Sequence, residues 1–274
     1  MDIILFVSGL ILCLIGITGS FVPVIPGPFI SWLAILIIKQ FKMKKLLFIS
    51  LAFLASYNIA QAQEQIYWSE VSMEVEPGDQ GQVYEAVNNF YSNLEFPENV
   101  SVQLMAWQAK TEWREGTHFL NFAGSVEGMA KLRELRSGDA YDEYVSSLSK
   151  VAKIVSVRNG STLIRVPGEN GNFSAQEWSF AVKNQAAFGQ AFVELTKDFK
   201  NEGMYYSLGQ YTSGGGLSTH YIYSTHKDYA QEMTSGPKNE KEAAAFQKFF
   251  DAVESISTFR GSETSTQLAT WPSN

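Results

Sequence analysis

The sequence predicts an α+β protein made of two tandem repeats, each in the order strand, helix, strand, strand, helix, strand, behind an apolar N-terminal segment. Three observations lead to this prediction. Stretches that alternate between apolar and polar residues are separated by stretches with the three- and four-residue spacing of amphipathic helices. Short sequence matches recur 102 residues apart. The long uncharged runs all lie within the first 62 residues.

The composition is that of a folded chain, and it excludes several classes of function. Of the 274 residues 45% are hydrophobic and 18% charged, with a net charge of −7. Residues 1–62 hold one acidic and four basic side chains, so the rest of the chain carries a net charge of −10. A chain this acidic does not neutralise phosphates, and we expect no nucleic-acid partner. With one cysteine, Cys13, and three histidines, we predict no disulfide and no metal site.

The first 42 residues predict a transmembrane hairpin. Residues 3–22 contain no charge and have about the length that crosses a bilayer core. Prolines then interrupt the helix, and a shorter apolar run over residues 29–38 forms the return arm. A buried soluble hairpin is the alternative. The pattern Gly9-Leu10-Ile11, Gly16, Gly19-Ser20, Pro23-Val24-Ile25-Pro26-Gly27-Pro28 and Ser31-Trp32-Leu33 resembles the start of the domain-of-unknown-function 456 family of small bacterial membrane proteins, over residues 1–41. The resemblance implies a glycine-rich, closely packed hairpin and no activity.

Residues 43–62 have the three parts of a secretory signal. Lys44 and Lys45 form the basic part, residues 46–55 the apolar part, and Ala60-Gln61-Ala62 a cleavage site with small residues. A third transmembrane helix is the alternative. Both interpretations place the lysine cluster in the cytoplasm and export the residues after 62. We therefore expect residues 1–62 to engage the membrane. The C-terminal domain is then either exported while anchored in a bacterial inner membrane, or periplasmic or secreted after cleavage following Ala62.

Internal matches indicate a duplicated domain in the exported part. Thr117-His118-Phe119-Leu120 recurs as Thr219-His220-Tyr221-Ile222, and the same spacing relates Tyr144 to Phe246, Leu148 to Phe250, Val151 to Val253 and Arg158 to Arg260. An earlier match, Tyr67-Trp68-Ser69 with Glu177-Trp178-Ser179, has a spacing of 110. We predict a first repeat over residues 63–167, a linker over 168–174 and a second repeat over 175–274.

Each element follows from local periodicity. In the first repeat we expect strands over residues 67–75, 100–109, 117–123 and 154–166. Its first helix carries an apolar stripe at Val83, Val87, Phe90 and Leu94, and its second ends in Tyr144, Leu148 and Val151. In the second repeat we expect strands over 204–211, 218–224 and 257–271, with helix stripes at Phe188, Phe192, Leu195 and Phe199 and at Phe246, Phe249, Phe250 and Val253.

This order is the split β-α-β arrangement of ferredoxin-like folds. A four-stranded sheet with helices on one face needs a cover for the other, and two copies can close face to face. In element order and duplication, residues 65–272 resemble the dimeric α+β barrel superfamily, which includes antibiotic-biosynthesis-monooxygenase-like domains. The resemblance implies a pseudo-dimeric barrel formed within one chain.

The strand faces that point away from the helices present aromatic side chains among a few polar ones. Such a mixture suits a small-molecule cavity, and it also suits a packed interface between two sheets. On the cavity interpretation, the predicted ligand-binding residues are Trp68, Glu70, Gln103, Trp107, Asn121, Tyr205, Tyr221 and Tyr223.

The histidines and glycines give weaker signals. His118 and His220 hold equivalent positions at strand starts, where they either form a metal or acid–base pair or are capping residues inherited through duplication. Strand alternation places both on the helix side. We expect His226 to begin a helix in solvent and Gly214-Gly215-Gly216 to form a hairpin loop. No nucleotide-binding, hydrolase or metalloprotease motif is present, so no catalytic residue is assigned.

The leading hypothesis from the sequence is a non-catalytic exported protein that binds a small ligand or a partner through its barrel, without a cofactor. One alternative, which the barrel resemblance implies, is a cofactor-independent monooxygenase-like or haem-handling enzyme. Some haem-degrading members of the superfamily use an Asn, a Trp and a His, and no His stands in a matching motif here. A second alternative is a membrane structural protein with a fused exported domain. The sequence predicts no oligomeric state.

Overall fold

The structure, a computed structural model, describes residues 65–168, 173–199 and 203–272. The chain divides into two units, residues 1–63 and 64–274, and the described residues all belong to the second. The predicted membrane hairpin over residues 1–42 and the predicted signal over residues 43–62 lie outside the described residues. Within the described ranges, no helix has both the length and the hydrophobicity to cross a membrane.

The described chain is an α+β protein whose two halves repeat one order of elements. The first half contains β1 (Tyr67–Val75), α4 (Gln80–Tyr91), β2 (Val100–Ala109), β3 (His118–Gly124), α5 (Val126–Leu135), α6 (Asp139–Leu148) and β4 (Ala152–Val166). The second contains β5 (Ser174–Val182), α7 (Gln185–Asp198), β6 (Tyr206–Ser213), β7 (His220–His226), α8 (Tyr229–Met233), α9 (Glu240–Val253) and β8 (Ser257–Trp271). The predicted element order is confirmed, except that two helices stand where the sequence predicted one between the third and fourth strands.

The described strands close into one antiparallel barrel in the order β1-β3-β2-β8-β5-β7-β6-β4. The fourth strand of each half joins the two halves. β4 pairs with β1 of its own half and β6 of the other, and β8 pairs with β5 and β2 in the same way. Both joining strands are 15 residues long, which allows each to reach two partners. Closure leaves no unpaired sheet edge between the halves.

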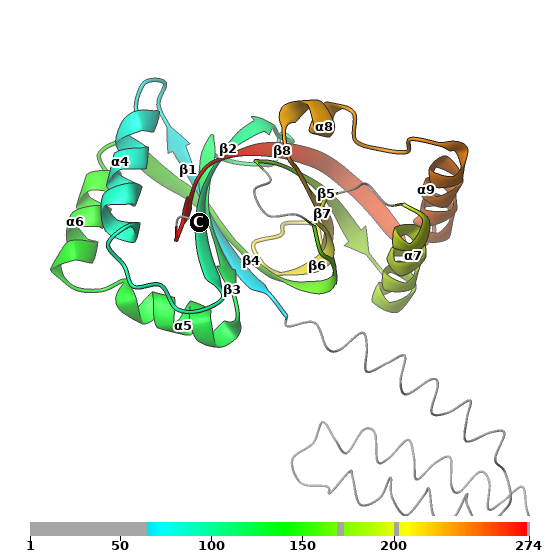
Figure 1. The fold of residues 1–274 in the computed structure, drawn as a ribbon, viewed down its shortest axis with the longest axis horizontal. Coiled ribbons are helices and arrows are strands. Elements are labelled where there is room, and N and C mark those ends of the chain that lie inside the picture. Colours follow the sequence, from blue (N-terminus) through cyan, green and yellow to red (C-terminus); the bar gives the residue numbers. More distant parts are fainter. Residues whose placement is uncertain (1–64, 169–172, 200–202, 273–274) are drawn as a thin grey trace, which may run out of the picture. The chain divides into compact units, whose positions relative to one another are not determined.

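The helices cover the outside of the barrel at two opposite ends (Figure 1). Helices α4, α5 and α6 cover the first half, and α7 and α9 cover the second. Each helix layer packs its apolar stripe on the sheet beneath it, which gives two separate cores. Val83, Val87 and Phe90 are buried as predicted, whereas Leu94 lies beyond the end of α4. Because the helices need only the outer sheet faces, the inner faces remain available to each other.

The correspondence between the first strands of the two halves differs from the prediction. Met73 pairs with His118, and Phe180 pairs with His220. Since the two histidines are equivalent, Met73 corresponds to Phe180, a spacing of 107 residues, so the predicted spacing of 110 is wrong. The sequence match of Trp68 with Trp178 gave the wrong spacing because the two side chains lie on opposite faces of the sheet. Trp68 faces the barrel interior, while Trp178 packs against Phe246 of α9.

The last strands also correspond differently. Arg158 of β4 lies opposite Glu70, and Glu263 of β8 lies opposite Glu177. Arg158 therefore corresponds to Glu263, and the predicted match with Arg260 is wrong. Register shifts interrupt both strand pairs, and in β8 the shift leaves Arg260 exposed beside it. A β-bulge changes residue spacing in this way, and identity matching alone does not detect it.

Two local predictions in the second half also need correction. Strands β6 and β7 each begin two residues later than predicted. His226 does not begin a helix in solvent but ends β7, and its side chain is fully buried. The helix begins instead at Tyr229, where Asp228 caps its first turn by accepting a hydrogen bond from the Gln231 backbone N–H. The glycine run 214–216 forms the predicted hairpin loop between β6 and β7.

Candidate functional site

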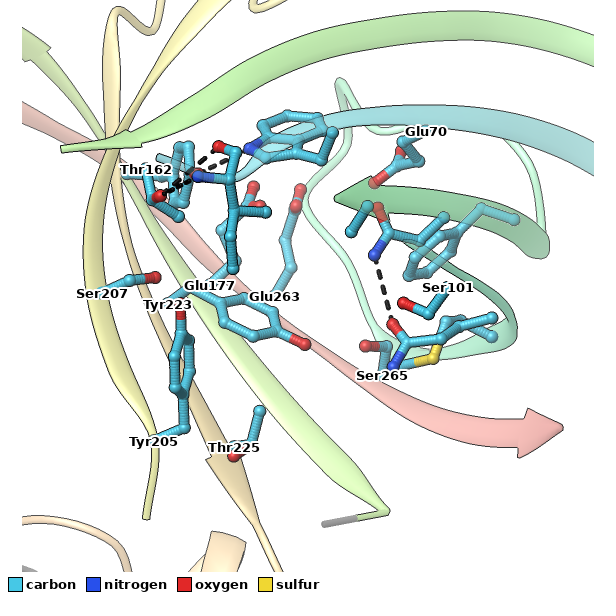
Figure 2. A pocket seen from close by; sticks show the side chains of 18 of the residues that line it. Glu70, Ser101, Thr162, Glu177, Tyr205, Ser207, Tyr223, Thr225, Glu263 and Ser265 are labelled. Carbon is cyan, nitrogen blue, oxygen red and sulfur yellow. Dashed lines mark hydrogen bonds between the residues drawn. The ribbon is translucent and has the colours of Figure 1, made fainter. Parts of the chain in front are cut away.

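The barrel interior contains a cavity of about 270 Å³. Side chains from all eight strands reach it, because every second residue of a strand points inward. The eight residues predicted from the sequence all line this one cavity: Trp68, Glu70, Gln103, Trp107, Asn121, Tyr205, Tyr221 and Tyr223. Figure 2 shows its wall, with Tyr205, Ser207, Tyr223 and Thr225 on the side of β6 and β7. A role for these residues in binding stays a prediction.

Aromatic side chains form the apolar part of the wall. Trp107 stacks on Phe119 with ring centroids 4.3 Å apart, and Met105 lies with them in a small cluster. Trp68 meets the edge of Tyr221, and its Nε1–H donates to the Tyr221 hydroxyl at 2.6 Å. The rings are thus held by stacking and hydrogen bonding, and the wall they form suits a flat apolar ligand.

A chain of side-chain amides forms part of the polar wall. Asn121 Nδ2 donates to Gln103 Oε1 at 3.2 Å, and Gln103 Nε2 donates to Gln267 Oε1 at 3.1 Å. These bonds link β3, β2 and β8 across the sheet and fix which end of each amide faces its neighbour. The orientation of the two predicted polar residues is therefore set before any ligand arrives.

Three carboxylates and two guanidinium groups form the charged part of the site. The Arg158 side chain binds both oxygens of Glu70, at 3.1 Å through Nε and 2.5 Å through Nη2, and it reaches Glu177 at 3.1 Å. Arg114, from the loop between β2 and β3, donates to Glu177 at 2.7 Å and to Glu263 at 2.6 Å through Nε. Neither arginine is more than 4% exposed, so this is a buried ion network.

Among the described residues, this network holds one more acid than base. A carboxylate without a compensating charge is costly to bury, so a proton on one of the acids relieves the excess. Burial, with a contribution from Glu177, raises the pKa of Glu263 to about 7 against the hydrogen bond from Thr111. Burial also raises the pKa of Glu70, although Arg158 opposes it. Of these two acids, Glu263 has a pKa near 7 and faces the cavity, so it can change its protonation state near neutral pH.

The tyrosines around this network stay protonated. Burial raises the pKa of Tyr211, Tyr221 and Tyr223, with nearby glutamates adding to the effect. The Tyr211 hydroxyl donates to Glu177 Oε1 at 2.7 Å and lies 2.8 Å from Ser179 Oγ. The phenols consequently act as neutral hydrogen-bonding groups and not as anions or metal ligands.

Two buried donors of the site lack a hydrogen-bond partner. They are Trp107 Nε1 and Arg114 Nη1, and the guanidinium of Arg114 lies 4.7 Å from the centre of the Trp107 ring. Arg114 Nη1 comes no closer than 3.6 Å to Glu70. An unsatisfied buried donor costs about 1–3 kcal/mol. For Trp107, which lines the cavity, a ligand oxygen could supply the missing acceptor.

A glycine in β8 allows the loop between β2 and β3 to place Arg114 in the charged network. Gly261 of β8 has φ +139°, and a Cβ built there would lie 2.5 Å from Cγ2 of Thr111. Only glycine leaves room for Thr111 to approach β8, where its hydroxyl donates to Glu263 Oε1 at 2.6 Å. The second half has glycines 214–216 in its corresponding hairpin loop, so only the first half supplies an arginine.

Sequence reasoning missed four members of the charged network: Arg114, Arg158, Glu177 and Glu263. Strand parity could have found Glu177 and Glu263, since each lies two residues from another inward side chain, Ser179 and Ser265. The wrong spacing of 110 instead paired Glu177 with Tyr67. No pattern in the loop points to Arg114, because its position depends on tertiary contacts.

The histidines do not line the cavity. His118 and His220 are buried, and each Nδ1 bonds to the hydroxyl of the preceding threonine, at 3.0 and 2.9 Å. Burial lowers the pKa of both, and it lowers the pKa of His226 to about 4, so all three are neutral near pH 7. In the part of the chain that the structure describes, no group of three or more His, Cys, Asp or Glu residues could hold a metal ion.

A second, smaller cavity of about 190 Å³ lies between the sheet and the helices of the second half. It arises where Ser224 takes the position that Phe122 holds in the first half. Its described lining carries no Asp, Glu, His, Lys, Arg or Cys side chain: Gln176, Trp178, Phe192, Leu195, Thr196, Phe199, Met204, Tyr206, Ile222, Ser224, Ser235, Gly236 and Phe246. Acid–base chemistry therefore favours the barrel cavity over this smaller one.

Comparison with known proteins places the fold but no family. No family model and no curated protein matches the chain, so the resemblance of residues 1–41 to a membrane family gains no support. A candidate monooxygenase from Lactobacillus acidophilus NCFM has a similar structure, with 13% identity and a TM-score of 0.54 over 76% of this chain and 96% of that one. A candidate monooxygenase from Fusobacterium nucleatum subsp. nucleatum has 12% identity and a TM-score of 0.52 over 75% and 93%.

These likenesses show that the chain shares the fold of α+β barrel proteins. They also correct the leading functional hypothesis. The sequence favoured non-catalytic binding, whereas two solved structures that share this fold across nearly their whole length are candidate monooxygenases. The hypothesis of a non-catalytic binding protein is therefore wrong on this comparison, and the enzymatic alternative takes its place as a proposal.

Proposed function

We propose that the barrel cavity is the active site of a cofactor-independent oxygenase acting on a small, flat hydroxyarene of the quinol or anthrone type, with Glu263 as the general base. One observation carries this proposal. Glu263, a buried carboxylate with a pKa near neutral pH, faces an aromatic-lined cavity. The equivalent position in the first half holds an arginine, Arg158. The likeness to candidate monooxygenases supports it at the level of the fold.

A general base works best when its pKa lies near the working pH. Glu263 meets this condition because burial and Glu177 raise its pKa to about 7. Thr111 and Arg114 each donate to one carboxylate oxygen, which fixes the orientation of the group. Each carboxylate oxygen has two acceptor positions. Nε and Nη2 of Arg114 occupy both positions of Oε2, and Thr111 occupies one of Oε1, so one position on Oε1 remains for a substrate proton.

The chemistry needs no resident cofactor, because the deprotonated substrate supplies the electrons. Glu263 removes a proton from the hydroxyarene or its ketone tautomer, and the resulting carbanion adds dioxygen at the ring carbon. The peroxide anion takes the proton back from Glu263 to give a hydroperoxide. Loss of the second C–H proton and cleavage of the O–O bond then convert the CH₂ group into a carbonyl group. One oxygen atom enters the product and the other leaves as water, so four electrons pass from carbon to dioxygen. The hydroxide that departs carries the first proton and takes up the second, so it leaves as water.

The remaining wall residues bind and orient the substrate in this proposal. Trp68, Trp107 and Phe119 provide apolar surface for a flat ring system. The amide chain of Asn121 and Gln103 offers hydrogen bonds to its oxygen substituents. A volume of about 270 Å³ is slightly below the roughly 300–1,000 Å³ usual for ligand pockets, which favours two or three fused rings over a larger molecule.

The haem-handling alternative does not fit the barrel cavity. Haem iron takes a His, Cys, Met or Tyr ligand. The described cavity lining contains no His or Cys, and its tyrosines stay protonated because burial raises their pKa. Met105 is packed with Phe119 and Ala175. No step of the proposed reaction therefore involves haem.

The experiment that tests the proposal is an oxygen-uptake assay of the purified full chain with anthrone as probe and no added cofactor. We expect one dioxygen consumed for each anthraquinone formed. Glu263→Gln should lower the rate about 10²–10⁴-fold, the usual contribution of a general base. Glu254→Gln, an exposed glutamate at the end of α9, is the matched control and should retain the full rate. Equal rates for the Glu263→Gln variant and the unmodified chain would contradict the proposal.

A separate proposal concerns location and rests on the sequence alone. We propose that residues 1–62 direct the barrel out of the cytoplasm, either as a membrane anchor or through a signal cleaved after Ala62. Mass spectrometry of the mature protein from its host distinguishes the two. Gln63 at the N-terminus indicates cleavage, and Met1 indicates an anchor. A barrel found in the cytoplasmic fraction contradicts both.

A further inference from the structure

The charged groups that face the barrel cavity are all of one sign. Its described lining includes the carboxylates of Glu70, Glu177 and Glu263, whereas neither arginine of the network is part of that lining. The guanidinium groups are paired with these carboxylates, and Arg114 and Arg158 are only 4% and 3% exposed. A ligand in the cavity therefore meets the acids directly and the bases only through them.

The aromatic faces of the lining have the same preference, whereas Trp107 Nε1 needs an acceptor. Six aromatic rings line the cavity: Trp68, Trp107, Phe119, Tyr205, Tyr221 and Tyr223. The face of an aromatic ring carries partial negative charge and attracts cations. Glu177 and Glu263 line the same cavity as these rings, and so do the hydroxyl-bearing residues Tyr205, Ser207 and Thr225, all labelled in Figure 2. Hydroxyl groups can accept as well as donate, so they adapt to either kind of ligand.

The arginines are not free to turn toward an anionic ligand. Arg114 binds Glu177 and Glu263, and its guanidinium also lies against the rings of Trp107 and Trp113, at 4.7 and 5.0 Å. Arg158 binds both oxygens of Glu70. Turning Arg158, or Nε and Nη2 of Arg114, toward a ligand would break a buried ion pair and leave a carboxylate exposed to the incoming anion. Such a loss is large when the pair is buried.

We infer that the cavity selects its ligand by charge: it takes an uncharged or cationic flat aromatic molecule carrying hydroxyl or amino groups, and it rejects the same molecule when it carries a carboxylate or phosphate. The inference rests on the proposed function for the position of the site, and it adds the substrate class. It follows from the three carboxylates and six rings of the described lining, which includes neither arginine.

A matched series of naphthalene probes tests this inference without turnover. We would measure binding of 1-naphthol, 1-naphthylmethylammonium and 1-naphthoate to the full chain by calorimetry, at pH 8 and under nitrogen. The dissociation constant of 1-naphthoate should be at least tenfold higher than that of 1-naphthol, and the ammonium probe should bind at least as tightly as 1-naphthol. Glu177→Gln should reduce the difference between the dissociation constants of 1-naphthoate and 1-naphthol, and Glu254→Gln should leave that difference unchanged.

The comparison of the three probes with the unmodified chain is decisive even if Glu177→Gln does not fold. Binding of 1-naphthoate within twofold of 1-naphthol, or tighter, overturns the inference, and so does the absence of binding by all three. A failure of the proposed function gives a different result. If the charge order holds and anthrone is still not oxidised in air, the site selects by charge but does not perform the oxygenation.

Discussion

Glu263 lies directly opposite Glu177 across the β5–β8 strand pair. Like charges in this position normally destabilise a sheet. The equivalent pair in the first half is Glu70 with Arg158, which is the favourable combination. The second half thus carries an acid where the first carries a base, and Arg114 from the neighbouring loop compensates only in part. This asymmetry creates the buried group that titrates near pH 7.

The first prediction concerns Arg114. Arg114→Gln removes a guanidinium that favours the ionised form of Glu263, so the pKa of Glu263 should rise further. Because the ion pairs are buried, the free energy of unfolding should fall by about 3–5 kcal/mol. Urea unfolding measures the loss. Lys197→Gln breaks an exposed ion pair with Glu194 and should change stability by no more than about 1 kcal/mol. Similar losses for the two variants would contradict a buried network.

The second prediction is the pH dependence of activity. Glu263 acts as a base only when ionised, and its pKa is about 7. The value of kcat/KM for anthrone should therefore rise with pH through about 7 and then level off. In Arg114→Gln the midpoint should move to higher pH. A profile of the unmodified chain that is flat between pH 6 and pH 8 would exclude Glu263 as the base.

The third prediction is that the free energy of unfolding falls as pH rises, whereas activity rises. The pKa of Glu263 is about 7 in the folded chain against an ordinary value of 4.5, so the folded state binds the proton more tightly. Its contribution to stability is complete below about pH 4.5 and is lost as pH rises through about 7, a change of about 3 kcal/mol. Urea unfolding at pH 5 and pH 8 should show this difference, and Glu263→Gln should remove most of it. If the free energy of unfolding of Glu263→Gln changes by the same amount between pH 5 and pH 8, groups other than Glu263 cause the change.

The fourth prediction concerns the glycine that admits the loop. Gly261→Ala places a Cβ against Thr111 at a positive φ, so the loop must move and activity should fall at least tenfold. Gly236→Ala is the matched control, since Gly236 has φ +120° and a Cβ added there would meet nothing within 4 Å. It tests backbone strain without the clash. Thr111→Ser keeps the hydroxyl that binds Glu263 and removes the clashing methyl, so the double variant should regain activity. Failure of this rescue would mean that the clash is not the cause.

Strand periodicity predicted much of the fold because one face of each strand is buried against helices. The bounds of the strands at 67–75, 100–109 and 257–271 are confirmed. Parity also predicted which side chains face the interior, and all eight predicted residues line one cavity. A face of a strand is a local property, and local sequence is sufficient to assign it.

The charged network depends on relationships that local sequence does not contain. Pairing of Glu177 with Glu263 depends on strand register, which the register shifts near Ser179 and Gly261 alter. The position of Arg114 depends on a loop that folds back against β8, which requires the glycine at 261. Matching by residue identity chose Trp178 for Trp68 because it ignores which face each side chain occupies. The chemistry of the site therefore emerged only with the structure.

The central claim is that Glu263 removes a proton from a substrate held in the barrel cavity. The most direct measurement mixes the full chain with anthrone under nitrogen and records the absorbance of the anthrone anion, which forms before any oxygen reacts. With Glu263 as the base, the anion should accumulate with the unmodified chain and with Glu254→Gln, but not with Glu263→Gln. Equal accumulation with and without the Glu263 carboxylate would contradict this role.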